Sequence, residues 1–194
     1  MQLIFASQNL HKIEEVEPLI PSFYQLLTLP GLKFEGEIPE TGNTLEENAL
    51  QKAQLIYDTF KIPCFADDTG LEVEALNGEP GVYSARYAGE KKSFQDNMDK
   101  LLDKLKGKKN RYAEFKTVIC LVGFGEPYYF KGILKGSIAE NKRGENGFGY
   151  DPIFIPEGYS ISMGEMVLEE KNKLSHRSLA VKSFIGFLKD YFGV

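Results

Sequence analysis

The stretch VICLVGFGEPYYF, Val118–Phe130, lies in the middle of the chain and indicates a β-hairpin. Val118–Val122 is apolar at every position, which is typical of a central strand covered on both faces. Gly125-Glu-Pro127 supplies turn residues. The two strands are therefore expected over Arg111–Phe124 and Tyr128–Ile138.

Strand-like and helix-like segments alternate on both sides of this hairpin. Thr44-Leu-Glu-Glu47 has the form of a capping box, so a helix should begin there and end before Pro63. In the helix expected over His176–Tyr191, Leu179, Phe184, Leu188 and Tyr191 should face inward. The pattern predicts an α/β fold with a mixed sheet in a single domain, residues 1–194. The other expected elements are strands at Gln2–Ala6, at Tyr24–Leu29 and on each side of Asp67-Asp68, and helices at His11–Ile20 and Phe94–Leu105.

The composition is that of an ordinary soluble globular protein, with 42% hydrophobic and 26% charged residues. No apolar run approaches the roughly 20 residues of a membrane span, and the first residues lack the pattern of a signal peptide. A net charge of −5 argues against a general nucleic-acid binder. Cys64 and Cys120 lie in apolar runs, which favours buried thiols in a cytoplasmic protein, and two cysteines with two histidines make a zinc site implausible.

The acidic pair Asp67-Asp68 directly follows a short apolar run. Asp and the nearby Gly suit a turn, but two carboxylates at a strand end also suit Mg²⁺. One of the two could bind the metal while the other takes a proton from water. Lys52 falls on the inward side of its helix, although a lone helical lysine is more often solvated.

Two further segments could bind an anionic ligand with a flat ring. Ser7–Lys12 connects a strand to a helix, where free N–H groups attract anions, although Ser7 or Asn9 could simply cap that helix. Gly144–Pro152 holds three glycines with Phe148 and Tyr150, which could stack on a base or pack on the core. Asp151 and the donors of Ser175-His-Arg177 suit a ring that carries carbonyl oxygens, as in hypoxanthine or xanthine.

In combination these segments resemble the inosine triphosphate pyrophosphatases, also called XTP/dITP diphosphatases. The resemblance runs from Phe5 to about Arg177, and its specificity comes from seven motifs in the same order. The motifs are Ser7-x-Asn9-x-x-Lys12, Glu40-Thr-Gly42, Glu46-Glu-Asn-Ala49 with Lys52-Ala53, Ala66-Asp-Asp-Thr-Gly-Leu71, Pro80-Gly-Val-Tyr-Ser-Ala-Arg86, Gly147-Phe-Gly-Tyr-Asp-Pro152 and Ser175-His-Arg177.

The resemblance implies an elongated α/β molecule with flanking helices, two lobes around a central cleft, and usually a homodimer. The implied reaction is Mg²⁺-dependent hydrolysis of ITP, dITP and XTP to the monophosphate and pyrophosphate. Asp68 would be the catalytic base and, with Glu40, would bind the metal. The triphosphate would contact Lys52 and the phosphate loop residues Ser7, Gln8, Asn9, Leu10, His11 and Lys12, and Thr69 would also contact the substrate. The nucleobase and sugar would contact Phe148, Gly149, Tyr150, Asp151, Lys171, His176 and Arg177.

Two rival functions stay open from the sequence. A Maf-type nucleotide pyrophosphatase would act on pyrimidine or modified nucleotides, and the Phe-Gly-Tyr-Asp and Ser-His-Arg motifs speak against it. A non-catalytic nucleotide sensor would keep the pocket without turnover, and it would have no use for the set Glu40, Asp67, Asp68 and Lys52.

Overall fold

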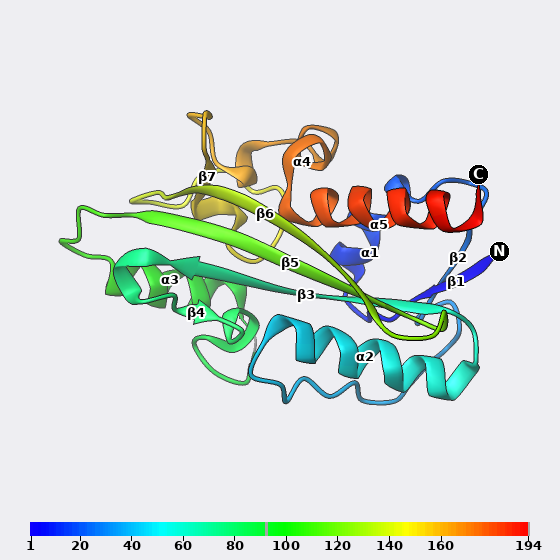
Figure 1. The fold of residues 1–194 in the computed structure, drawn as a ribbon. Helices are drawn as coiled ribbons and strands as arrows, with labels where there is room; N and C mark the ends of the chain where they lie inside the picture. Colours follow the sequence, from blue (N-terminus) through cyan, green and yellow to red (C-terminus); the bar gives the residue numbers. More distant parts are fainter. Residues whose placement is uncertain (92, 194) are drawn as a thin grey trace. The chain divides into compact units, whose positions relative to one another are not determined.

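A computed structural model describes residues 1–91 and 93–193 and shows a mixed sheet flanked by helices (Figure 1). The chain forms two compact units. Unit 1 comprises residues 1–68, 117–132 and 177–194, and unit 2 comprises residues 69–116 and 133–176. The α/β class with a mixed sheet is confirmed, whereas a single domain over 1–194 stays a prediction.

In unit 1, strand β1 (Gln2–Phe5) pairs in parallel with β2 (Gln25–Thr28) and with the start of β3 (Cys64–Val73). The order continues through β5 (Tyr112–Val122) and β6 (Tyr128–Ile138), so the predicted hairpin strands are present.

The sheet of unit 1 is covered on both faces by helices. Helix α2 (Leu45–Phe60) covers one face, and α1 (Leu10–Val16) and α5 (His176–Phe192) cover the other (Figure 1). Alternate residues of a strand point to opposite faces of the sheet, so each strand contributes side chains to two hydrophobic cores, one on each face. The core under α2 includes Ile4, Cys64, Ala66, Cys120 and Val122, and the core under α1 and α5 includes Leu3, Phe5, Phe65, Ile119 and Leu121.

Unit 2 is built on the other ends of β3, β5 and β6. Strand β4 (Pro80–Gly81) pairs antiparallel with β3, and β7 (Phe154–Pro156) pairs antiparallel with β6. Helices α3 (Phe94–Lys104) and α4 (Leu168–Leu174) belong to this unit. Short 3₁₀ turns occur at Glu17–Leu19, Glu74–Leu76, Ser84–Arg86, Asp151–Ile153 and Met163–Glu165.

Three expectations differ from the structure. The two strands expected around the acidic pair are one continuous strand, β3, which carries both aspartates in its middle. Helix α4 was not predicted because its sequence is polar and short. Leu179 and Tyr191 of α5 do not face inward: they are 38% and 51% exposed, because the buried stripe runs instead through Ala180, Val181, Phe184, Ile185 and Leu188.

Candidate active site

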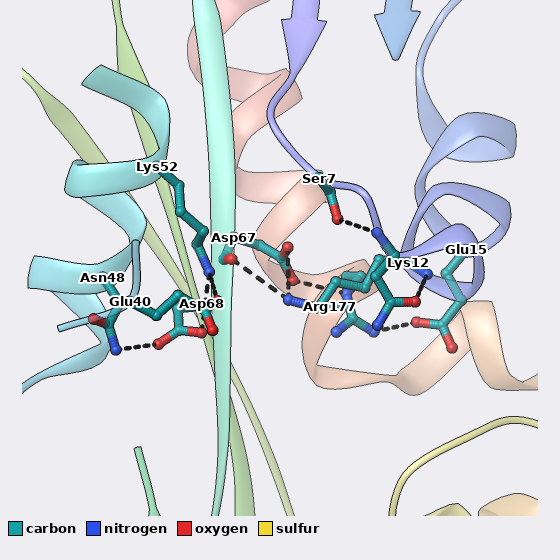
Figure 2. Close-up of polar contacts among 10 residues, drawn as sticks. Ser7, Lys12, Glu15, Glu40, Asn48, Lys52, Asp67, Asp68 and Arg177 are labelled. Atoms are coloured by element: carbon teal, nitrogen blue, oxygen red, sulfur yellow. Dashed lines mark hydrogen bonds and ion pairs between the residues drawn. The ribbon is translucent and has the colours of Figure 1, made fainter. Parts of the chain in front are cut away.

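The pleat of β3 sends the two neighbouring aspartates to opposite faces of the sheet. Asp68 follows the face of Ala66 toward α2, and Asp67 follows the face of Phe65 toward α1 and α5 (Figure 2). Both residues are buried, and each has its own set of partners. The two aspartates therefore belong to two separate polar clusters and do not form one cation-binding site.

On the α2 side, Asp68 lies in a cluster that contains one cation and a second acid. The Nζ atom of Lys52 lies 3.2 Å from Asp68 Oδ1 and 2.6 Å from Glu40 Oε1. Asn48 donates from Nδ2 to Asp68 Oδ2 at 3.0 Å. The two carboxylates thus converge on a single ammonium group (Figure 2).

Helix α2 supplies both Asn48 and Lys52 because residues four apart share a face. The predicted capping box at its start is present: Thr44 accepts from Glu47 N–H, and the Glu47 side chain accepts from Thr44 N–H. Lys52 is only 5% exposed, so it is not a solvated surface lysine. Burial by itself lowers the pKa of Lys52, but Asp68, Glu40 and Asp67 outweigh burial and raise it.

The α2-side cluster has few acidic groups. Within residues 1–91 and 93–193, no group of three or more His, Cys, Asp or Glu side chains is arranged to hold a metal ion. Glu40 and Asp68 remain as a two-carboxylate set with hard oxygen donors. Such a set suits Mg²⁺, which typically takes one or two carboxylates and completes its octahedron with water and substrate phosphates.

On the opposite face, Asp67 is held by two cations from different helices. Lys12 Nζ of α1 lies 3.0 Å from Asp67 Oδ1, and Arg177 Nε of α5 lies 3.0 Å from Asp67 Oδ2. The Arg177 guanidinium also donates through Nη1 to Glu15 (Figure 2). Arg177, Asp67 and Glu15 are all buried.

These charges fix the ionisation of the network. Burial disfavours the charged form of Asp67, but Lys12, Arg177 and Lys52 together hold its pKa well below the ordinary value of 3.8. Burial likewise opposes the charge of Arg177, and Glu15 and Asp67 more than offset it, so the pKa of Arg177 is raised. For Lys12 burial prevails and the pKa is lowered.

We expect Asp67 to make folding stability pH-dependent in acid. A depressed pKa contributes stability that is complete above the unfolded value near 3.8 and is lost as the pH falls below it. Between pH 7 and pH 3, wild type should lose on the order of 1 kcal/mol more stability than Asp67→Asn. Urea unfolding at both pH values measures this loss, with exposed Asp190→Asn as the control that should follow wild type. Equal losses in wild type and Asp67→Asn would contradict the assignment.

The predicted phosphate loop, Ser7–Lys12, lies between β1 and α1. Asn9 is the N-cap of α1, and its Oδ1 accepts from Lys12 N–H at 3.3 Å, so the capping interpretation is correct for Asn9. Ser7 Oγ accepts from Asn9 N–H at 3.2 Å. Gln8 donates to the Gly36 carbonyl at 3.2 Å. Leu10 and His11 are exposed, so neither belongs to the polar cluster of Lys12.

Unit 2 holds the predicted base-binding residues Phe148, Asp151 and Lys171. Asp151 Oδ2 accepts from Phe148 N–H at 2.8 Å and lies 2.5 Å from Lys171 Nζ, and that ammonium lies 5.0 Å from the centre of the Phe148 ring. Gly147, with φ +73°, permits this turn, since a Cβ there would lie 2.1 Å from Asp151 Oδ2. Asp151, which was expected to bond to the edge of a purine, thus already uses one of its carboxylate oxygens within this cluster.

The remaining predicted site residues of unit 2 lie outside the cluster of Phe148, Asp151 and Lys171, and Tyr150 and His176 have other partners. Tyr150 is buried and donates its hydroxyl to the Ser84 carbonyl at 2.9 Å, so it anchors its loop to the core. The His176 ring stacks on Phe115 with 4.5 Å between centroids. Thr69 and Gly149 are half-buried. Arg177, which was expected beside these residues, belongs to unit 1 and contacts Asp67.

Two residues of the polar clusters around the acidic pair were not among the predicted site residues. Glu15 pairs with Arg177, and Asn48 contacts Asp68. A signal existed for each: Glu15 lies three residues after Lys12 on the helix face that also buries Val16, and Asn48 lies four residues before Lys52.

Comparison with known proteins assigns the family. Residues 3–187 match the Ham1 family. The dITP/XTP pyrophosphatase of Flavobacterium psychrophilum is 52% identical over 190 residues, which covers 98% of this chain and all of that protein. The Staphylococcus aureus Ham1 protein has a TM-score of 0.89 at 42% identity, with 98% of this chain and 100% of that chain covered. A Coxiella burnetii HAM1 protein has a TM-score of 0.90 at 35% identity, with 98% and 99% covered. This chain therefore belongs to the Ham1 family and has its fold.

Proposed function

We propose that this protein hydrolyses the non-standard purine nucleoside triphosphates dITP, XTP and ITP to the monophosphate and pyrophosphate, and so removes them from the nucleotide pool. The observation that carries the proposal is the buried cluster in which Lys52 joins the carboxylates of Glu40 and Asp68. Membership of the Ham1 family and the relatives named dITP/XTP pyrophosphatase support it.

The metal of this reaction is proposed to be Mg²⁺, held by Glu40 and Asp68. When bound, the ion would supply neutralisation of phosphate charge beside the attacked phosphorus. Two carboxylates that already converge on one cation, the Lys52 ammonium, fit this use. Lys52 itself is fully charged at neutral pH, since its pKa is raised, and it can bind a phosphate oxygen.

Asp68 is proposed as the general base, and Asp67 is not. A base must reach water and accept a proton, and the Asp67 side chain is only 1% exposed with each oxygen bonded to a cation. Its depressed pKa makes it a poor proton acceptor. The Asp68 side chain is 11% exposed. A water oxygen would attack the α-phosphorus, Asp68 would take the proton, and the bond to the leaving pyrophosphate would break.

We propose the following substrate contacts. Ser7–Lys12 would bind phosphate oxygens, mainly through Ser7 and Lys12, and Thr69 would contact the substrate. Phe148 with Lys171 offers a ring and a donor for a base that carries carbonyl oxygens. A homodimer in the cytoplasm is also proposed, because the family resemblance implies a dimer. The structure has no membrane-spanning helix among the residues it describes.

The test is an end-point assay with ITP, dITP, XTP, ATP, GTP and dTTP, with and without Mg²⁺. Phosphate is measured before and after inorganic pyrophosphatase is added. We expect phosphate only after that addition, only with Mg²⁺, and at comparable rates for ITP and dITP, with ATP and GTP slower by at least tenfold. Direct release of phosphate would mean cleavage at the γ-phosphorus. Turnover of dTTP but not of dITP would favour the Maf-type function, and binding of ITP without turnover would favour a sensor.

A further inference from the structure

We propose that Asn48 is a positioning residue that sets the orientation of the Asp68 carboxylate, an inference that rests on the proposed function. Asn48 is 1% exposed and uses both ends of its amide. Its Nδ2 donates to Asp68 Oδ2 at 3.0 Å, and its Oδ1 accepts from Gly42 N–H at 2.8 Å. One buried side chain thereby links helix α2, strand β3 and the loop before α2 (Figure 2 shows the contact with Asp68).

The two hydrogen bonds fix which way the amide points. The NH₂ group must face the carboxylate and the oxygen must face the Gly42 N–H, since the reverse orientation would place two acceptors together at Asp68 and two donors together at Gly42. No other side chain of this size offers one donor and one acceptor in that arrangement. Aspartate would retain the acceptor for Gly42 but would place a second carboxylate against Asp68.

The loop held by Asn48 carries the second carboxylate of the cluster. Gly42 lies two residues after Glu40, and a Cβ at Gly42 would come within 2.6 Å of Glu47 Cβ and 2.9 Å of Asn48 Oδ1. This close approach lets the loop bond directly to α2. Asn48 therefore holds Asp68 by one end and the segment after Glu40 by the other, while Lys52 bridges the two carboxylates.

Lys52 alone does not define the plane of the Asp68 carboxylate. An ammonium group is a compact point charge with rotatable donors, and it contacts only Oδ1. The Asn48 bond to Oδ2 adds the second fixed point that stops rotation of the carboxylate. Catalytic groups need such support to stay in the productive geometry, and loss of an outer hydrogen-bond partner in metal sites typically costs about 10–100-fold in metal affinity or activity.

The decisive experiment compares Asn48→Ala with Asn97→Ala in the full-length protein. Asn97 is a matched control: it is 2% exposed, lies on helix α3, accepts from Ala88 N–H at 2.6 Å and donates to the Ala85 carbonyl at 3.0 Å. Both variants lose two buried hydrogen bonds, so both should lose thermal stability. Only Asn48→Ala should lower kcat for dITP, by about 10–100-fold, with KM changed less than about threefold.

Asn48→Asp separates the two ends of the amide. It retains the acceptor for Gly42 but not the donor for Asp68, so its kcat should fall at least as far as that of Asn48→Ala. If kcat falls in Asn48→Asp alone, charge repulsion is the cause and the proposal is overturned. Equal effects of Asn48→Ala and Asn97→Ala on kcat would also overturn it. If Asn48→Ala does not fold, Asn48→Ser replaces it with the same expected result.

The activity of wild type distinguishes failure of the positioning role from failure of the proposed function. Wild type without turnover of any purine triphosphate would reject the function itself. Wild type that hydrolyses dITP, together with an Asn48→Ala variant of unchanged kcat, would reject only the positioning role.

Discussion

Asp68→Asn should lower kcat for dITP and XTP by about 10²–10⁴-fold, because general-base help of this kind is typically worth that much. The variant should stay folded. Asparagine has nearly the same shape, can still accept from Asn48 Nδ2, and leaves Lys52 paired with Glu40 at 2.6 Å. The same change also removes one of two proposed Mg²⁺ ligands, so a higher Mg²⁺ concentration should be needed for half-maximal rate.

The measurement is steady-state pyrophosphate release over a range of Mg²⁺ concentrations, with circular dichroism and thermal unfolding as checks of folding. Asp58→Asn is the control, because Asp58 lies on α2 with a side chain that is 56% exposed, and its partners are Gln54 on the same helix and Lys61 at the helix C-cap. Its kcat should match wild type. A folded Asp68→Asn protein that keeps kcat within about tenfold of wild type would remove Asp68 from the role of base.

Period-two alternation along β3 places the two neighbouring aspartates on opposite faces of the sheet. Phe65 and Asp67 share one face, and Ala66 and Asp68 share the other. The sequence predicts two strands around the adjacent carboxylates, because polar residues usually mark a strand end. The continuous strand tolerates both carboxylates because each is paired with at least one cation on its own side of the sheet.

Contacts between distant parts of the chain could not be predicted from local patterns. Arg177 lies 110 residues from Asp67 and 162 from Glu15, and neither spacing leaves a periodic signal. The hairpin strands and the Thr44 cap were predictable because their signals are short-range. The predicted inward face of α5 is right for Phe184 and Leu188 and wrong for Leu179 and Tyr191. Apolar residues occur all around that helix, so several stripes fit the same sequence.

Arg177→Met is expected to destabilise the folded protein by about 3–5 kcal/mol, the usual cost of removing one partner from a buried ion network. Methionine is similar in length but leaves Glu15 without the Nη1 donor and Asp67 without the Nε donor, both in a buried environment. The free energy of unfolding in urea at pH 7 measures the loss. Arg143→Met is the matched control, because Arg143 is exposed and its replacement should cost less than about 0.5 kcal/mol.

The double variant Arg177→Met/Glu15→Gln tests the cause of that loss. If the cost of Arg177→Met is mainly an uncompensated buried charge, neutralising Glu15 as well should recover part of the stability, so the double variant should be more stable than the single one. If the cost is lost packing, the second substitution should add to the damage. Recovery would identify Arg177 as the charge that keeps Asp67 and Glu15 ionised inside the protein, and so as the reason why Asp67, unlike Asp68, is not available as a base. Additional loss, or a single variant as stable as wild type, would remove that explanation of how the two aspartates differ.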